Sequence, residues 1–98
     1  MKIIILAVAE RELSEAIVYY NSECPGLGYE FALETRDSLK RIGSFPDAWP
    51  PFSKTTRRCL INRFPYGILY QKRKDEIIVY AFMHLKRNPE TWLKRLHV

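Results

Sequence analysis

The hydrophobic pattern changes its period along the first half of the chain. Residues 2–8 form a short apolar run rich in β-branched side chains, which is typical of a strand covered on both faces, or nearly so. The apolar spacing then becomes helical and predicts one helix over about 10–22 and a second over about 27–42, with Gly43 as its C-terminal cap. Because only a few residues, including Pro25 and Gly26, separate the two helices, we expect them to pack as an antiparallel hairpin.

The second half of the sequence has strand-like patterns. A proline-rich loop over 44–55 is followed by three stretches with β character: Arg58–Phe64, Gly67–Lys72 and Ile77–His84. The third stretch is apolar at both parities, so it is expected to be a central strand. Asn88, Pro89 and Glu90 then resemble a helix start. The order is β-α-α-β-β-β-α, which predicts a single α+β domain over 1–98, with the helical hairpin packed on a small, mostly antiparallel sheet and a short C-terminal helix.

Charge is distributed unevenly between the two halves. The 98 residues carry a formal net charge of +5, but residues 1–53 contain five basic and eight acidic side chains, whereas residues 54–98 contain eleven basic and three acidic ones. Such asymmetry favours a polyanionic or acidic partner for the second half, although a solvated basic face would have the same composition. At this length, a two-domain enzyme or a full nucleotide-binding sheet is excluded.

The cysteines and the first residues of the sequence indicate the cellular compartment in which the protein is expected. Cys24 and Cys59 are far apart and belong to no metal-binding motif, so we expect free thiols, no metal and no cofactor. The apolar run after Lys2 meets charged residues too soon to be a secretory signal or a membrane span. A cytoplasmic protein without membrane contact is therefore expected.

Basic and aromatic side chains are interleaved in the predicted sheet. The sequence contains no phosphate-binding loop, nucleophile elbow or zinc-protease motif. Cations that meet phosphates beside rings that stack on bases are typical of RNA-binding surfaces, and such a face could also cleave RNA without a metal. Strand alternation places Arg57 and Arg63 on one face and Arg58 on the other. The same tyrosines could instead belong to the core, and the arginines could simply keep an exposed sheet soluble. The constellation comprises Lys54, Arg57, Arg58, Arg63, Lys72, Arg73, Lys86 and Arg87, with Tyr66, Tyr70 and His84.

Two segments of the second half resemble the RelE/ParE superfamily of toxins. Residues 57–70, RRCLINRFPYGILY, are similar to its R-R-x-x-x-x-x-F-P-Y-x-I-x-Y core, and residues 81–92, AFMHLKRNPETW, are similar to its A-x-x-H-x-x-R-x-P-x-x-W ending. The predicted element order also fits this fold. The resemblance implies the toxin of a bacterial type II toxin–antitoxin pair, which a protein antitoxin holds inactive in a hetero-oligomeric complex.

The resemblance leaves two targets open. RelE-like members cut messenger RNA on the ribosome; here Lys54, Arg63, Arg87 and His84 would then form the catalytic set. ParE-like members inhibit DNA gyrase, and the FPY and HxxRxPxxW patterns are closer to this branch. Trp92 also stands where a RelE-like proton carrier would be needed, and an indole cannot transfer a proton. The residues expected to contact RNA or another target are Arg57, Arg58, Tyr66, Tyr70 and Lys86.

An antitoxin would bind through coupled folding. A disordered, acidic and amphipathic segment would place apolar side chains in a groove between the hairpin and the sheet, and its charges would meet the basic half. The candidate anchors for that segment are Leu13, Ile17, Trp49 and Trp92, all of which could equally be core residues. A third possibility is a non-toxic binding module with the same fold.

Overall fold

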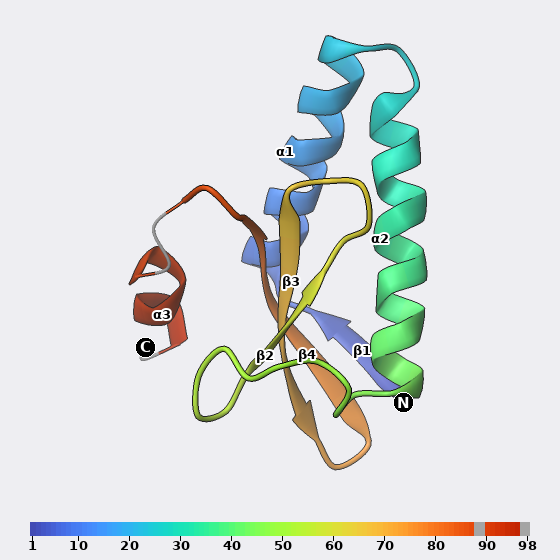
Figure 1. The fold of residues 1–98 in the computed structure, drawn as a ribbon. Helices are drawn as coiled ribbons and strands as arrows, with labels where there is room; N and C mark the ends of the chain where they lie inside the picture. Colours follow the sequence, from blue (N-terminus) through green and yellow to red (C-terminus); the bar gives the residue numbers. More distant parts are fainter. Residues whose placement is uncertain (88–89, 97–98) are drawn as a thin grey trace.

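The computed structural model describes residues 1–87 and 90–96 and forms a helical hairpin on a four-stranded sheet (Figure 1). The α+β element order matches the one predicted. The proposed helix start at Asn88 and Pro89 lies outside the described residues. The elements are β1 (Lys2–Ile5), α1 (Ala7–Glu23), α2 (Leu27–Ser44), β2 (Arg57–Leu60), β3 (Tyr66–Arg73), β4 (Glu76–His84) and α3 (Glu90–Leu96).

The strand order in the sheet is β1-β4-β3-β2, which makes β4 a central strand as its two-sided apolar pattern predicted. β1 pairs with β4 in parallel, from Lys2 opposite Glu76 to Ile5 opposite Val79. The other neighbours are antiparallel, and a bulge interrupts the β3–β4 register between Leu69 and Tyr70. β1 therefore lies at one edge, and its isoleucines are only partly buried, less covered than the sequence suggested.

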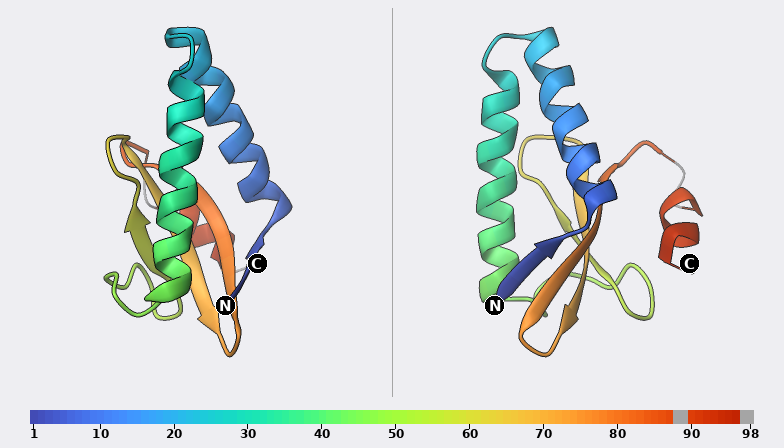
Figure 2. Two further views of the ribbon diagram at one scale, coloured as in Figure 1. Left: turned by 90° about the vertical axis from the view of Figure 1, so that its right-hand side faces the viewer. Right: turned by 180° about the vertical axis from the view of Figure 1, so that it is seen from behind.

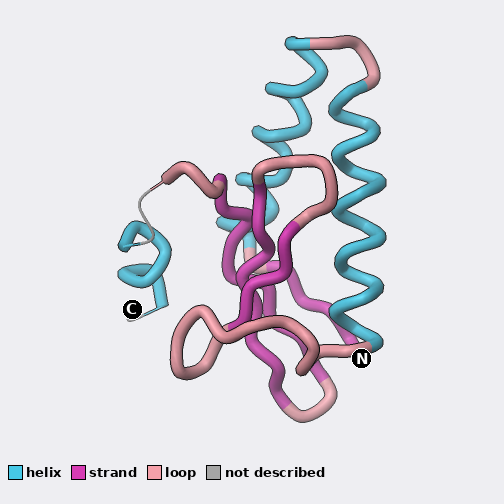
Figure 3. Tube along the Cα trace, in the orientation of Figure 1, coloured by secondary structure: helices cyan, strands magenta, loops and turns pink. Residues whose placement is uncertain are grey.

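The hairpin and α3 cover opposite faces of the sheet (Figures 2 and 3). Under the hairpin, Phe31 and Ile42 from α2 pack with Ile68, Val79 and other sheet residues in the larger core. On the other face, Trp92 from α3 packs on Leu69, Ala81 and Met83. β3 and β4 contribute to both cores, which explains why so many of their side chains are buried.

A close helix–helix contact fixes the start of the hairpin. Gly26 has φ of 88°, which glycine adopts without strain, and the chain reverses there. The Asn21 side chain then accepts a 2.8 Å hydrogen bond from the backbone N–H of Gly28, so α1 caps the first turn of α2. A Cβ at Gly28 would overlap the carbonyl oxygen of Ile17, and this contact therefore requires glycine.

Three differences from the predicted boundaries exceed one residue. The first is at the β1–α1 junction, where β1 ends at Ile5 instead of residue 8. α1 begins at Ala7 instead of residue 10, because alanine favours helix and Ala9 packs in the core. Gly43 is not the cap of α2: the helix continues to Ser44, and the Phe45 N–H bonds to the Arg41 carbonyl.

The third difference concerns β2, which ends at Leu60 instead of Phe64. The N–H of Ile61 bonds to the carbonyl of Tyr66, and Arg63 takes a left-handed φ of 73° in the turn. Arg63 and Arg57 therefore do not share a strand face, contrary to the alternation argument.

Candidate functional site

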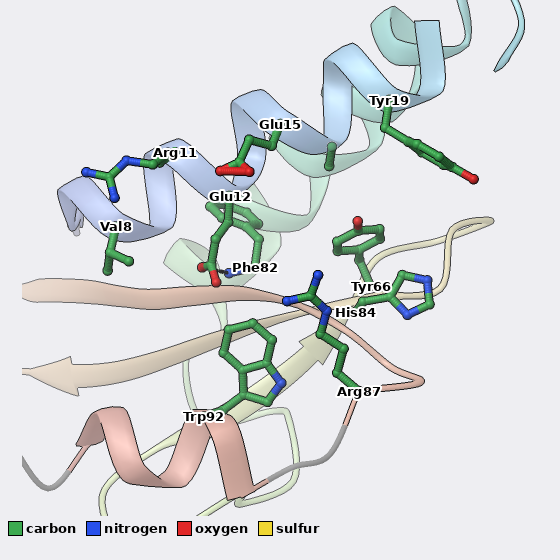
Figure 4. A pocket seen from close by; sticks show the side chains of 11 residues that line it. Val8, Arg11, Glu12, Glu15, Tyr19, Tyr66, Phe82, His84, Arg87 and Trp92 are labelled. Carbon is green, nitrogen blue, oxygen red and sulfur yellow. Dashed lines mark hydrogen bonds between the residues drawn. The ribbon is translucent and has the colours of Figure 1, made fainter. Parts of the chain in front are cut away.

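A cleft of about 510 Å³ opens between α1, the end of β4 and α3 (Figure 4). α1 contributes Val8, Glu12 and Tyr19 to one wall, and the sheet contributes Tyr66 and His84. β1 ends at Ile5, so it pairs with β4 only as far as Val79, and the later part of β4 lies beside α1 without a strand between them. The complete lining is Val8, Arg11, Glu12, Glu15, Ala16, Tyr19, Tyr66, Phe82, His84, Arg87 and Trp92.

The two rings from the sheet are held against each other. Tyr66 and His84 are register partners across β3 and β4, and their ring centroids lie 5.1 Å apart at an interplanar angle of 76°. Nδ1 of His84 accepts a 3.1 Å hydrogen bond from the backbone N–H of Lys86. The neutral imidazole therefore carries its proton on Nε2 and acts as a donor at that atom. Burial raises the pKa of Tyr66, and the nearby Arg87 guanidinium opposes part of that rise, so the phenol stays protonated at neutral pH.

An ion pair connects the two sides of the cleft. Arg95 of α3 donates two 3.0 Å hydrogen bonds to the two carboxylate oxygens of Glu12 on α1. The Phe82 N–H of β4 donates to the same carboxylate at 3.2 Å, and Arg95 also donates to the Tyr80 carbonyl at 3.1 Å. The guanidinium lies 4.8 Å from the Trp92 ring centroid. Glu12 therefore neutralises Arg95 and satisfies a sheet N–H that no neighbouring strand meets.

Trp92 provides an unused donor. Its side chain is 2% exposed, and its buried Nε1 has no hydrogen-bond partner among residues 1–87 and 90–96. In Figure 4 this nitrogen lies on the side of the ring toward Arg87. A buried donor without an acceptor is uncommon and marks a place where an acceptor from a ligand would be stabilising.

The residues of the candidate RNA-cutting set do not share one place. His84 and Arg87 line the cleft, whereas Lys54 lines a second, smaller pocket of about 250 Å³ in the proline-rich loop with Arg57 and Lys72. Arg63 is 3.0 Å from Glu30 and 3.9 Å from Glu34 on α2. The structure thus brings together two of the four residues.

The other target-contact candidates are also dispersed. Arg57 donates to the Trp49 carbonyl, and the Arg58 guanidinium lies 5.8 Å from the Phe52 ring centroid. Tyr70 is fully buried and donates a 2.6 Å hydrogen bond to the Pro46 carbonyl. Lys86 follows β4 and is exposed. Only Tyr66 of this group lines the cleft.

The four candidate anchors for an antitoxin are core or near-core residues. Leu13, Ile17 and Trp49 are partly buried against the larger core, and Trp92 is buried in the smaller one. Large apolar side chains that are exposed instead include Val18, Tyr19 and Tyr29 toward the tip of the hairpin.

Metal-binding clusters and membrane-spanning helices are both absent from the part of the chain that the structure describes. Residues 1–87 and 90–96 contain no group of three His, Cys, Asp or Glu side chains that could hold a metal ion. Within the same ranges, no helix is both long and apolar enough to span a bilayer.

The fold can be compared with known structures. A chain of the solved "Chromosomal ParDE TA system from P. aeruginosa" matches with a TM-score of 0.64 and 14% sequence identity, over 88% of this chain and 97% of that chain. This chain has the ParE toxin fold. No family model and no curated protein matches the sequence itself. The ParE-like fold agrees with the resemblance found in residues 57–70 and 81–92, and with the predicted element order.

Several cleft residues of this ParE-like fold were not predicted from the sequence. Glu12, Glu15 and Arg11 looked like solvent-exposed charges at the start of a helix, and Arg95 carried no motif. The spacing of Arg11 and Glu15, one helical turn apart, does place them on one side of α1. The pairing of Glu12 with Arg95 had no local signal, because 83 positions separate the two residues.

Proposed function

We propose that this protein is the toxin of a type II toxin–antitoxin pair, that a protein antitoxin neutralises it, and that its target is DNA gyrase. The observation that carries the proposal is the likeness of its fold to the chain from the P. aeruginosa ParDE system. The FPY and HxxRxPxxW patterns, which are closer to ParE-like sequences, give independent support from this chain's own residues.

The dispersal of the basic residues supports gyrase over messenger RNA as the target. A metal-free ribonuclease needs cations and a proton carrier around one phosphate. Here Lys54 lies in another pocket, and Arg63 is paired with α2 carboxylates. Because Glu12 is paired with Arg95, the charged side chains left in the lining are Arg11, Arg87 and Glu15, and their single excess cation is too little charge for a polyanionic strand.

The hydrogen bonding of His84 also supports gyrase over messenger RNA as the target. A general base must offer a free nitrogen lone pair to the proton that it accepts. Nδ1 is already occupied by the Lys86 N–H, and Nε2 carries the proton of the neutral ring. In this arrangement the imidazole donates hydrogen bonds and does not take a proton from a ribose hydroxyl.

One observation favours a second candidate, the ribosome-dependent ribonuclease. Tyr66, His84 and Arg87 do meet in one cleft, and they are the residue types that such cleavage uses. Rotation of the His84 ring would free a nitrogen, at the cost of the Lys86 hydrogen bond. The two candidates therefore need to be separated by experiment.

Charge and surface chemistry support the antitoxin as partner. Residues 54–98 carry eleven basic and three acidic side chains, which suits an acidic segment. The cleft between α1 and the sheet gives such a segment a place beside apolar side chains such as Val8. A segment that folds on this surface would be released when the antitoxin is degraded.

The test is inducible expression with and without the protein of the neighbouring gene. We expect growth arrest alone, rescue by a neighbour that combines a DNA-binding domain with an acidic tail, and loss of supercoiling when purified toxin meets purified gyrase. Transcript ends are mapped in the same cells. The double variant Arg63→Ala with Arg87→Ala is tested in the same way. Codon-phased cleavage that is lost in this variant would mean that the target is messenger RNA and not gyrase. Harmless expression in several hosts would overturn the toxin proposal and leave a non-toxic binding module.

A further inference from the structure

We propose that the cleft contains a subsite for one carboxylate, supplied by an aspartate or glutamate side chain of an acidic peptide, with Trp92 and Arg87 as its donors and His84 and Tyr66 beside them in the lining. The inference rests on the proposed function in one respect only: the peptide is taken to be the neutralising segment. The subsite itself follows from the hydrogen-bonding state of the cleft.

The first step is the excess of donors. Trp92 Nε1 is buried and has no partner among the residues that the structure describes, and His84 presents Nε2–H because Nδ1 is occupied. Tyr66 and Arg87 form no hydrogen bond with another side chain within residues 1–87 and 90–96. All four residues line the same cleft, and the Trp92 nitrogen lies on the side of its ring toward Arg87 (Figure 4), so one carboxylate between these two side chains would accept from both.

The second step is that the acceptors already present are used or remote from these donors. Glu12 is occupied by two bonds from Arg95 and one from the Phe82 N–H. Glu15 lies on α1 and is exposed, and it forms no ion pair with a described residue. Figure 4 shows Glu12 and Glu15 on the α1 side, with Tyr66, His84 and Arg87 grouped across from them.

The third step sets the charge of the ligand. With Glu12 neutralised by Arg95, the remaining charged side chains of the lining are Arg11, Arg87 and Glu15. They leave one net positive charge, which matches a single carboxylate. A nucleic acid strand would bring several phosphates to a cleft that has one cation in excess.

The fourth step is geometric. A carboxylate has two oxygens with about four acceptor positions, and it can accept from a guanidinium while it also accepts from ring N–H groups. The Trp92 ring is held in place by the smaller core and by the Arg95 guanidinium at 4.8 Å. A donor fixed in this way loses little conformational freedom on binding.

The experiment observes the indole N–H directly by NMR of the ¹⁵N-labelled full chain. The sequence has two tryptophans, and Trp49 lies outside the cleft, so its indole signal is an internal reference. The probe is N-acetylglutamate α-amide, which has one carboxylate. Its control is N-acetylglutamine α-amide, which has the same shape and no charge. Both are titrated at constant ionic strength.

We expect a saturable downfield shift of the Trp92 indole signal with the glutamate probe, and none with the glutamine control. Arg87→Gln should weaken binding by roughly tenfold, as expected for the loss of a charge-assisted bond. Arg36→Gln makes the same chemical change on exposed α2, outside the cleft, and should bind as the parent does. Trp92→Phe keeps an aromatic ring, although a smaller one, and removes the donor. It should also weaken binding, read from the Arg87 backbone amide.

Three results would overturn the subsite. They are the absence of a saturable shift, an equal response to both probes, and unchanged affinity in both Arg87→Gln and Trp92→Phe. Tighter binding of uridine 3′-monophosphate with the same Trp92 shift would instead assign the cleft to RNA. If the subsite fails while gyrase inhibition and antitoxin rescue are observed, the proposed function stands without it.

Discussion

Glu12 and Arg95 form a pair of parallel 3.0 Å hydrogen bonds that joins the first helix to the last, across 83 positions of sequence. The Glu12 carboxylate also accepts the Phe82 N–H, so one side chain holds α1, β4 and α3 together. α3 otherwise packs mainly through Trp92. The position of the cleft wall that α3 provides thus depends on this pair.

Glu12→Ala should lower the free energy of unfolding by about 1–2 kcal/mol, because it leaves a guanidinium and a backbone N–H without partners in a partly buried place. Urea denaturation, followed by tryptophan fluorescence, measures the change. Arg95→Ala should have a similar effect and should also remove the cation above Trp92.

The double variant Glu12→Ala with Arg95→Ala measures the interaction between the two side chains apart from the contacts that each makes with other residues. The two losses should be clearly less than additive if the residues act together. Additive losses would mean that the pair contributes nothing beyond the separate contacts of each side chain.

Two helical glycines should respond in opposite ways to the same substitution. Gly28→Ala should destabilise the protein by about 1–3 kcal/mol, because a Cβ would overlap the Ile17 carbonyl and the Asn21 side chain. Gly43→Ala should stabilise it by about 0.5–1 kcal/mol, because the site is helical and the nearest atom to a new Cβ is Ile3 Cδ1 at 3.7 Å. The melting temperatures of the two variants, compared with that of the parent protein, measure both effects. Equal shifts would contradict the close approach of α1 and α2.

The folded protein should become less stable at alkaline pH, and Tyr70 should account for part of this loss. Burial raises the pKa of its phenol from 10.0 to about 12 in the folded protein. Because the unfolded chain loses this proton at lower pH, the contribution of Tyr70 to the free energy of unfolding should be steady below pH 10.0 and fall as the pH rises toward about 12.

Tyr70→Phe provides the control for this decline. It should cost about 1 kcal/mol at neutral pH, because the bond to the Pro46 carbonyl is lost, and it should make the alkaline decline shallower. Burial also raises the pKa of Cys59 to about 11, so part of the decline should persist in this variant. An unchanged pH profile would rule out Tyr70 as its source.

The two thiols should differ sharply in reactivity. Cys24 is exposed at the hairpin turn, whereas Cys59 is buried and its pKa is raised to about 11. A thiol reagent at neutral pH should modify one cysteine of the native protein rapidly and the second only after denaturation. Cys24→Ser should remove the fast phase. A fast phase that persists in Cys24→Ser would show that β2 opens readily.

Periodicity was sufficient for the elements and for their order. The helical spacing of α1 and α2 and the two-sided apolar pattern of β4 survive in the structure because local pattern and burial agree there. The predicted ends of helices and strands were wrong where a tertiary contact determined the observed end. Arg63 reads as part of a strand, but it lies in a left-handed turn beside Glu30 of α2.

The candidate site was predictable only in part. His84 and Arg87 stand out because they belong to a motif, and Tyr66 because it follows Phe64 and Pro65 in another. Lys54 and Arg63 were grouped with them by residue type, but sequence proximity does not determine which sheet edge a side chain faces. The role of Glu12 depends on Arg95, and no window of local sequence contains both residues.

The pairing of β1 with β4 also determines when the molecule can become complete during its synthesis. The hairpin of α1 and α2 can form from local contacts, but β1 has no partner strand until residues 76–79 are made, and Arg95 follows still later. A ribosome that has translated the first half carries the hairpin without the sheet beneath it and without a closed cleft. The surface on which we place the function therefore arises only after residue 95 has been made.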